Sequence, residues 1–446
     1  MIKICSFLVR IGPISMLEKL FQLKEHGTDV KTEIIAGVTT FLTMAYIIVV
    51  NPDILSASGM DYGAVFAATC IAAAIGSLIM GLLANYPIAL APGMGLNAFF
   101  AFAVVQGMGH IWQVALGAVF LSGVIFFFLS IFKVREWIIN SIPLSLRFGI
   151  SAGIGFFLAL IALKNAGIVI DHPATLVSIG DITSLPSLLT LSGFFIICAL
   201  AYRRVTGAVM IGIIAITVIS LILGLIDYKG FASMPPSLAP TFMQMDIAGA
   251  LNVGLVSIVF AFLFVDLFDT SGTLIGAAHQ GKLLDQNGKL PRLGKALMAD
   301  SVATMSGAAL GTSTTTSYIE STAGISTGGR TGLTAVIVAV LFLLCLFLSP
   351  IASIVPAYAT APALLYVAVL MASGLSHVDW DDITEAAPAA VTALMMPLTF
   401  SIANGIAIGF ITYTAIKLCS GKLSSLNISL VLISILFVLK FIFLGA

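Results

Sequence analysis

The feature that most constrains this chain is a series of long, continuous apolar runs that recurs along nearly the whole sequence. Only helices or closed barrels can cross a lipid bilayer, because unpaired backbone groups are too costly there. The runs are not the alternating segments of about ten residues that a barrel requires, so they predict helices. Charged residues make up 9% of the 446 residues, against about 25% in soluble domains. The sequence therefore predicts an all-α polytopic membrane protein.

The apolar runs form two sets of seven, which we interpret as two related halves. The first repeat, 33–226, follows a leader at 1–32 and contains the spans 33–50, 64–84, 91–106, 112–132, 147–164, 187–203 and 206–226. The second repeat, 248–418, contains the spans 248–275, 293–310, 313–326, 331–349, 357–375, 386–402 and 404–418. The last two spans are separated by a turn at Asn404 and Gly405. An extra C-terminal hydrophobic helix at 425–446 either crosses the membrane or lies against the bundle.

Positive charge sets the expected orientation, since lysine and arginine gather on the cytosolic side. Five such residues precede the first span, whereas the predicted outside loops 51–63, 107–111 and 165–186 contain none. We therefore expect a cytosolic N-terminus in a cytoplasmic (inner) membrane. Because seven is odd, the second half enters from the opposite side, which gives an inverted repeat typical of transporters. The net charge of zero gives no electrostatic case for binding nucleic acid.

The third span of each half is short and interrupted, at 91–97 and at 311–317. Interrupted segments at matching positions are the best sequence indication of a transporter's binding site. The alternative is that glycine and proline are simply common in membrane helices. We favour the binding site, because the interruptions match in both halves.

Two acids lie deep in the apolar run 260–270. Asp266 and Asp269 are three residues apart and share a helix face, which Thr270 continues. A charged acid at bilayer depth costs about 2.5–3.5 kcal/mol or more, so we expect it to face a cavity or a partner. Two acids this close should not both ionise easily, which suits proton coupling. The alternative is helix–helix hydrogen bonding.

Further polar residues lie on the interrupted segments. Glu320 and Ser317 follow a run of five hydroxyl residues at 312–316, where free backbone groups must line a cavity. Asn97 has the equivalent place in the first half, and Phe99 beside it could stack on a planar ring. Packing or lipid contact is the alternative for Phe99, and a helix cap or ion pair for Glu320.

Other acids are weaker candidates. We expect Asp300, which follows Lys295 near the start of a span, to form an ion pair on the cytosolic side. We interpret the acids after the twelfth span as part of a solvated connection, at Asp379, Asp381, Asp382 and Glu385.

Several long motifs resemble one family. They stand in the family's order at 35–46, 50–52, 91–100, 267–274 and 318–321. The chain resembles the nucleobase:cation symporter-2 group, in its AzgA-like purine permease branch. The resemblance implies fourteen transmembrane helices as two inverted seven-helix repeats. Helices one to four and eight to eleven then form a core domain, and the others form a gate domain.

The resemblance also implies how the site is built. A nucleobase is held between short strand-bearing segments of helices three and ten. The binding carboxylates carry over as Asp266 and Glu320, with Asp269 and Asn97 as supporting polar residues. It further implies that the protein can work as a homodimer.

These observations predict a proton-coupled carrier that imports purine nucleobases by alternating access. Asp266 favours guanine and hypoxanthine, since a carboxylate accepts from ring N1–H and the exocyclic amine. An adenine permease of the same family is the alternative. No P-loop, Ser-His-Asp, HExxH or zinc pattern occurs, so we expect no cofactor beyond H⁺ as coupling ion, and no enzyme. A membrane enzyme, a channel and an anion transporter of the same architecture are the rival interpretations.

Overall fold

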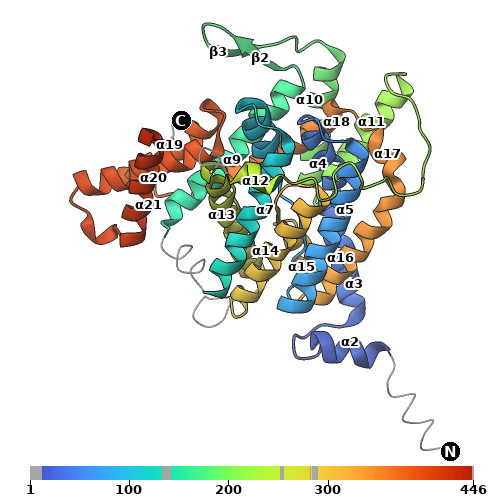
Figure 1. Ribbon diagram of the computed structural model, residues 1–446. Coiled ribbons are helices and arrows are strands. Elements are labelled where there is room, and N and C mark those ends of the chain that lie inside the picture. The colour runs from blue at the N-terminus through green and yellow to red at the C-terminus, as the bar shows by residue number, and fades with distance from the viewer. Residues whose placement is uncertain (1–12, 133–141, 252–255, 282, 284–289, 444–446) are drawn as a thin grey trace, which may run out of the picture.

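The computed structural model describes residues 13–132, 142–251, 256–281, 283 and 290–443 (Figure 1). The first twelve residues of the predicted leader lie outside the described residues. The same holds for 252–255 within the predicted eighth span and for 444–446 at the end of the predicted C-terminal helix.

Each predicted span in the first half corresponds to helical structure. The first span is broken between two helices, α3 and α4, and the second ends in a π-helical turn, η1. The bounds are α3 Val30–Met44, α4 Ile47–Ser56, α5 Tyr62–Ile79, η1 Met80–Ala84, α7 Trp112–Ile131, α9 Leu144–Asn165, α10 Leu185–Tyr202 and α11 Ala208–Ile222. In the third span, strand and helix share the segment.

The second half follows the same pattern, with a final helix, α21, after the fourteenth span. The bounds are α12 Ile247–Ala250, α13 Val256–Gln280, α14 Leu293–Leu310, α16 Gly332–Cys345, η3 Leu346–Leu348, α17 Ser349–Ser353, α18 Ala357–Ala372, η4 Ser373–His377, α19 Ile383–Leu398, α20 Ile402–Cys419, η5 Leu423–Ser425 and α21 Ile428–Phe443. Among the described residues, 8 helical stretches are long and apolar enough to cross a membrane. Shorter apolar helices supply further predicted spans.

The predicted turn at Asn404 and Gly405 was wrong by a few residues. α19 ends at Leu398, and α20 begins at Ile402 after Ser401, whose hydroxyl accepts a hydrogen bond from the Asn404 amide at 3.3 Å. Serine is a strong N-terminal cap, so the helix begins just after it. Asn404 and Gly405 therefore lie in the first turn of α20.

The two interrupted segments meet in one small sheet. β1 (Leu90–Pro92) continues into α6 (Met94–Ala98) and the π-helical η2 (Phe99–Gly107), and β4 (Thr315–Ser317) is followed by α15 (Ser321–Ser326). The strands pair antiparallel, with Leu90 opposite Ser317 and Pro92 opposite Thr315. This confirms the prediction of strand-bearing segments in the third and tenth spans.

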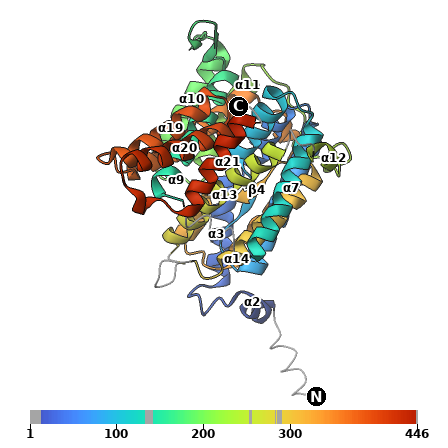
Figure 2. The ribbon, with the colours of Figure 1, turned by 60° about the vertical axis from the view of Figure 1, so that its left-hand side comes forward.

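The helices pack as two groups. α14 packs against α7 and α5, and α16 packs against α3 and α5, whereas α9 packs against α18 and α19. α19 also packs against α20, which lies beside α21 on one side of the molecule (Figures 1 and 2). These groups correspond to the predicted core and gate domains. A hydrogen bond of 2.8 Å from the Thr360 hydroxyl on α18 to Asp53 Oδ2 on α4 joins them.

Two further elements mark the opposite ends of the molecule. The hairpin of β2 (Val169–His172) and β3 (Leu176–Ile179) projects from one end, and α2 (Pro13–Phe21) lies at the other (Figure 1). The hairpin lies in a segment that we expected to be a plain loop. Its strands are four residues each and mostly exposed, so no buried face gave them an alternating pattern.

Glu33 generates a prediction about stability. Its buried carboxylate on α3 accepts from the backbone N–H groups of Arg330, Thr331 and Thr334, at 2.8, 3.2 and 3.1 Å, and so caps the start of α16. Each buried donor left unsatisfied costs about 1–3 kcal/mol. We expect Glu33→Ala to lower the melting temperature of the purified protein, whereas replacement of the exposed Glu25 by alanine should not. Equal melting temperatures for the two variants would contradict this role.

Candidate functional site

The paired broken segments form the frame of the candidate site. The Gly93 amide donates to the Thr314 carbonyl at 2.9 Å, and the Tyr318 amide donates to the Ala89 carbonyl at 3.0 Å, which extends the contact beyond the strands. The Ser77 hydroxyl on α5 bonds both backbone groups of Leu90, at 2.9 and 3.0 Å. Non-helical backbone at membrane depth needs such partners, so the two segments are held rigidly against each other.

Thr270 joins three elements at one hydroxyl. Its oxygen lies 3.1 Å from Asp266 Oδ1, 3.0 Å from Asp300 Oδ1 and 2.6 Å from the Thr316 hydroxyl, and all four residues are buried. A hydroxyl has one proton to donate and two lone pairs. It can therefore donate to one carboxylate and accept from a protonated one.

The predicted position of Asp300 was wrong. We expected it at the cytosolic edge beside Lys295. The structure instead buries it on α14, where it shares Thr270 with Asp266. Asp300 lies about two turns into α14, which the sequence can indicate. Its distance from α13 depends on how the two helices pack, and the sequence does not show that distance.

Asp269 faces the other broken segment. Its Oδ2 lies 3.4 Å from the point where a Cβ on Gly93 would stand, just before α6 begins. One turn on, the Thr273 hydroxyl lies 2.6 Å from the Ser317 hydroxyl on β4. Hydrogen bonds of Thr270 with Thr316 and of Thr273 with Ser317 thus join one face of α13 to β4. The predicted shared face of Asp266, Asp269 and Thr270 is the face that carries these contacts.

Glu320 lies between β4 and α15 and is half-buried. Its Oε1 accepts a hydrogen bond of 2.5 Å from the Tyr46 hydroxyl, and its main-chain oxygen accepts one of 3.3 Å from the Thr43 hydroxyl. Thr43 lies in the last turn of α3, and Tyr46 follows in the break before α4. Nothing in the pattern of the first span singles out Tyr46, since its contact with Glu320 joins the two halves of the chain.

Asn97 lies on α6, where its side-chain oxygen accepts from the Ser313 hydroxyl. Its amide nitrogen is buried and has no hydrogen-bond partner among the described residues. Phe99 is fully buried and packs edge-on against Phe262 at 5.0 Å between ring centroids. Asn97 therefore offers donors to a ligand, whereas the Phe99 ring is already engaged in packing.

The acids after α18 belong to a different environment. Asp381 is exposed, and the Lys422 ammonium, bonded to Asp382 at 2.7 Å, holds the pKa of that carboxyl well below its usual range. Glu385 is not part of a solvated connection as predicted. It lies in the first turn of α19, and its carboxylate pairs at 2.5 Å with the buried Lys417 ammonium. These residues lie in the gate group and away from β1 and β4.

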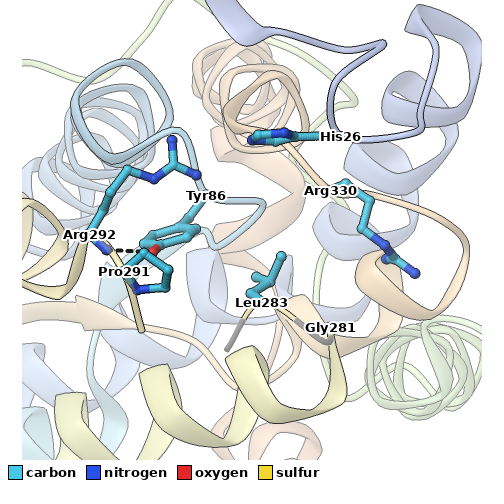
Figure 3. Close-up of a pocket in the computed structure, with 7 residues that line it drawn as sticks. All are labelled: His26, Tyr86, Gly281, Leu283, Pro291, Arg292 and Arg330. Atoms are coloured by element: carbon cyan, nitrogen blue, oxygen red, sulfur yellow. Dashed lines mark hydrogen bonds between the residues drawn. The ribbon is translucent and has the colours of Figure 1, made fainter. Parts of the chain in front are cut away.

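A cavity of about 380 Å³ lies elsewhere, between the leader and the facing ends of α13 and α14 (Figure 3). It is lined by His26, Tyr86, Gly281, Leu283, Pro291, Arg292 and Arg330. The Arg292 guanidinium lies over the Tyr86 ring, 4.8 Å from its centroid. None of the acids described above lines it, so we do not assign the candidate site to this cavity.

The acids and hydroxyls around β1 and β4 suit one kind of ligand. Carboxylates accept hydrogen bonds, and the Asn97 amide donates them, so a flat polar molecule with N–H and acceptor groups fits. Among the described residues, no group of three histidine, cysteine or acidic side chains is arranged to hold a metal ion.

Comparisons with known proteins agree on the family. A family model described as "Permease family" matches residues 31–440. The adenine permease AdeP of Escherichia coli (strain K12) is 53% identical over 431 residues, which cover 97% of each chain. The guanine/hypoxanthine permease PbuG of Bacillus subtilis (strain 168) is 47% identical over 440 residues, which cover 96% of this chain and 100% of that one. The predicted family resemblance is confirmed, and the family is one of transporters rather than enzymes.

Solved structures agree on the fold. The transmembrane domain of a cyanobacterium bicarbonate transporter, BicA, aligns with a TM-score of 0.65 at 17% identity, covering 84% of this chain and 97% of that one. A structure of the murine anion transporter Slc26a9 aligns with a TM-score of 0.66 at 12% identity, covering 93% and 72%. At such low identity the likeness concerns the fold alone, and it confirms the predicted inverted-repeat architecture.

Gly93 gives a prediction about how the frame is built. A Cβ at this position would lie 2.7 Å from Thr316 Cγ2 on β4, which is closer than side chains tolerate. We expect Gly93→Ala to lower the melting temperature by separating α6 from β4. Thr316→Ser removes the obstructing methyl group and keeps the hydroxyl, so it should restore the melting temperature of the Gly93→Ala protein.

Gly374→Ala is the matched control, because its added Cβ would lie 3.4 Å from Phe148, at ordinary contact distance. A Gly93→Ala protein as stable as the wild type would show that β4 does not press against α6 at this point.

Proposed function

The chain belongs to the Permease family as a nucleobase:cation symporter-2 protein, and we propose that it imports purine nucleobases together with protons. Similarity over nearly the full chain to proteins named as adenine and guanine/hypoxanthine permeases supports nucleobase transport. The observation that carries the proposal is the cluster of buried acids beside the paired broken segments. Such a site at the middle of an inverted repeat is the usual place for a transported substrate.

In this proposal Glu320 and Asp266 bind the nucleobase. Both accept hydrogen bonds, and charge-assisted bonds to a ring N–H are about twice as strong as neutral ones. The amide of Asn97 donates to an acceptor on the purine edge, while Thr270 and Ser317 hold the acids and β4 in place. Phe99, two residues after Asn97, borders the proposed site, and its ring is held in place by packing against Phe262.

Proton coupling is supported by the contacts of Asp266, Thr270 and Asp300. Two buried carboxylates bonded to one hydroxyl repel each other when both are charged, so a proton on one of them is favoured. Asp269, which lies close to Gly93, and Glu320 add acids to the same region. A proton can thus be taken up on one side of the membrane with the substrate and released on the other. H⁺ is the proposed coupling ion, without a cofactor.

We propose guanine and hypoxanthine as preferred substrates, because both present a ring N1–H to the Asp266 carboxylate. A site built for a donor rejects the analogue that lacks it, since its own polar group is left unpaired. Adenine is the second candidate. It is favoured by the higher identity to the adenine permease AdeP, 53% against 47% for the guanine/hypoxanthine permease PbuG.

The proposal includes the setting of the protein. We place it in the cytoplasmic membrane with its N-terminus in the cytosol, following the distribution of lysine and arginine. Assembly as a homodimer is part of the same proposal.

Uptake of labelled bases into cells that lack their own purine carriers tests the function. We expect uptake of guanine and hypoxanthine to collapse when an uncoupler dissipates the proton gradient while the sodium gradient is kept. Unlabelled guanine should compete better than adenine. Uptake that follows sodium would defeat proton coupling, and better competition by adenine would favour the second candidate.

Glu320 should matter far more than an acid outside the site. Loss of a hydrogen bond to a charged group costs about 1.5–3 kcal/mol, so we expect Glu320→Gln to weaken uptake by roughly 10- to 100-fold. Asp381→Asn, in the exposed connection before α19, should leave uptake near the wild-type level. The two variants are compared at equal abundance in the membrane. Similar uptake by both would mean that the substrate binds elsewhere.

A further inference from the structure

Tyr46 lies at the break between α3 and α4 and is completely buried. Its hydroxyl donates to Glu320 Oε1 at 2.5 Å. The Thr43 hydroxyl, in the last turn of α3, lies 3.3 Å from the main-chain oxygen of the same residue, but its nearest acceptor is the Thr40 carbonyl at 2.7 Å. The break in the first span therefore holds Glu320 by its side chain, through Tyr46.

We propose that Tyr46 is a positioning residue that fixes the Glu320 carboxylate for substrate binding. This inference rests on the proposed function, in which Glu320 binds the nucleobase, and it adds a residue that does not itself touch the substrate. A distance of 2.5 Å is typical of a strong bond from a hydroxyl to a carboxylate oxygen. One carboxylate oxygen is thereby occupied, and the other is oriented.

The remaining contacts of Glu320 support this assignment. Glu320 stands at the N-terminal cap of α15, yet its side chain makes no capping hydrogen bond. Among the described residues, no side chain from another part of the chain donates to its second oxygen, Oε2, which is therefore open to a donor on a ligand.

The neighbouring phenol, Tyr318, does not bind the Glu320 carboxylate. The Tyr318 hydroxyl, two residues from Glu320, donates instead to the Pro92 carbonyl at 2.5 Å and so fastens β4 to β1. Tyr318 therefore holds the backbone of the site, whereas Tyr46 holds the carboxylate. A side chain kept in one orientation loses less freedom when the ligand binds, which strengthens binding.

Tyr46→Phe removes the hydroxyl and keeps the buried ring. We expect the KM for the transported base to rise about tenfold, the equivalent of about 1.4 kcal/mol, while Vmax per carrier stays within about twofold. The melting temperature without substrate should stay near the wild-type value, and the stabilisation produced by added base should shrink. Tyr358→Phe is the matched control, since it removes a hydroxyl that bonds Ser220 at 3.0 Å in the gate group, and its KM should be unchanged.

A second replacement separates the hydrogen bond from packing. 3-Fluorotyrosine at position 46 retains a hydroxyl that is a stronger donor, so KM should stay at or below the wild-type value. The proposal is overturned if Tyr46→Phe leaves KM unchanged, if Vmax falls with melting temperature as in a damaged fold, or if fluorotyrosine raises KM as much as phenylalanine does. Purine uptake by the wild-type protein is measured in parallel. Its absence would defeat the proposed function, whereas uptake with an indifferent Tyr46→Phe variant would defeat this inference alone.

Discussion

The pairing of β1 with β4 is the contact on which the rest of this structure depends. A helix satisfies its own backbone hydrogen bonds, but a break at membrane depth leaves N–H and C=O groups that lipid cannot satisfy. Here the breaks in the two halves satisfy each other, with Ala91 opposite Thr316. The hydroxyls of Ser77 and Ser321 accept hydrogen bonds from the backbone N–H groups of Leu90 and Ala89, respectively. Both halves of the chain must therefore be in place before either broken segment is stable.

The same pairing explains why the acids gather where they do. α13 lies against β4 through Thr270 and Thr273, which brings Asp266 and Asp269 to the broken segments. α14 adds Asp300 through the shared Thr270 hydroxyl. The first span adds Tyr46 on Glu320. Segments from both halves of the chain thus meet around one two-stranded sheet, and the hydroxyl residues between the acids let the acids lie close together in a buried place.

Much of the architecture could be predicted, because the length and hydropathy of a short stretch of chain decide whether that stretch crosses the bilayer as a helix. Every apolar run contained a helix, and the interruptions at 91–97 and 311–317 marked the strands, because proline removes a helical hydrogen bond and hydroxyl side chains compete for backbone groups. Errors occurred where a local signal was weak or misread. The turn between α19 and α20 follows the cap at Ser401, and the exposed β2–β3 hairpin has no buried face to give it a pattern.

The sequence by itself determined the membrane setting, the order of the apolar spans, the inverted repeat, the family and the candidate acids Asp266, Asp269 and Glu320. These follow from hydropathy, motif order and the cost of charge in lipid, which are properties of short stretches of chain. Only the tertiary structure decided which acids share a partner. The burial of Asp300 beside Thr270, the contact of Gly93 with Thr316 and the hydrogen bond from Tyr46 to Glu320 join residues from different helices. Such contacts depend on how the helices pack, because a hydrogen bond requires atoms to lie within about 3 Å, and the spacing along one helix carries no information about the distance to another.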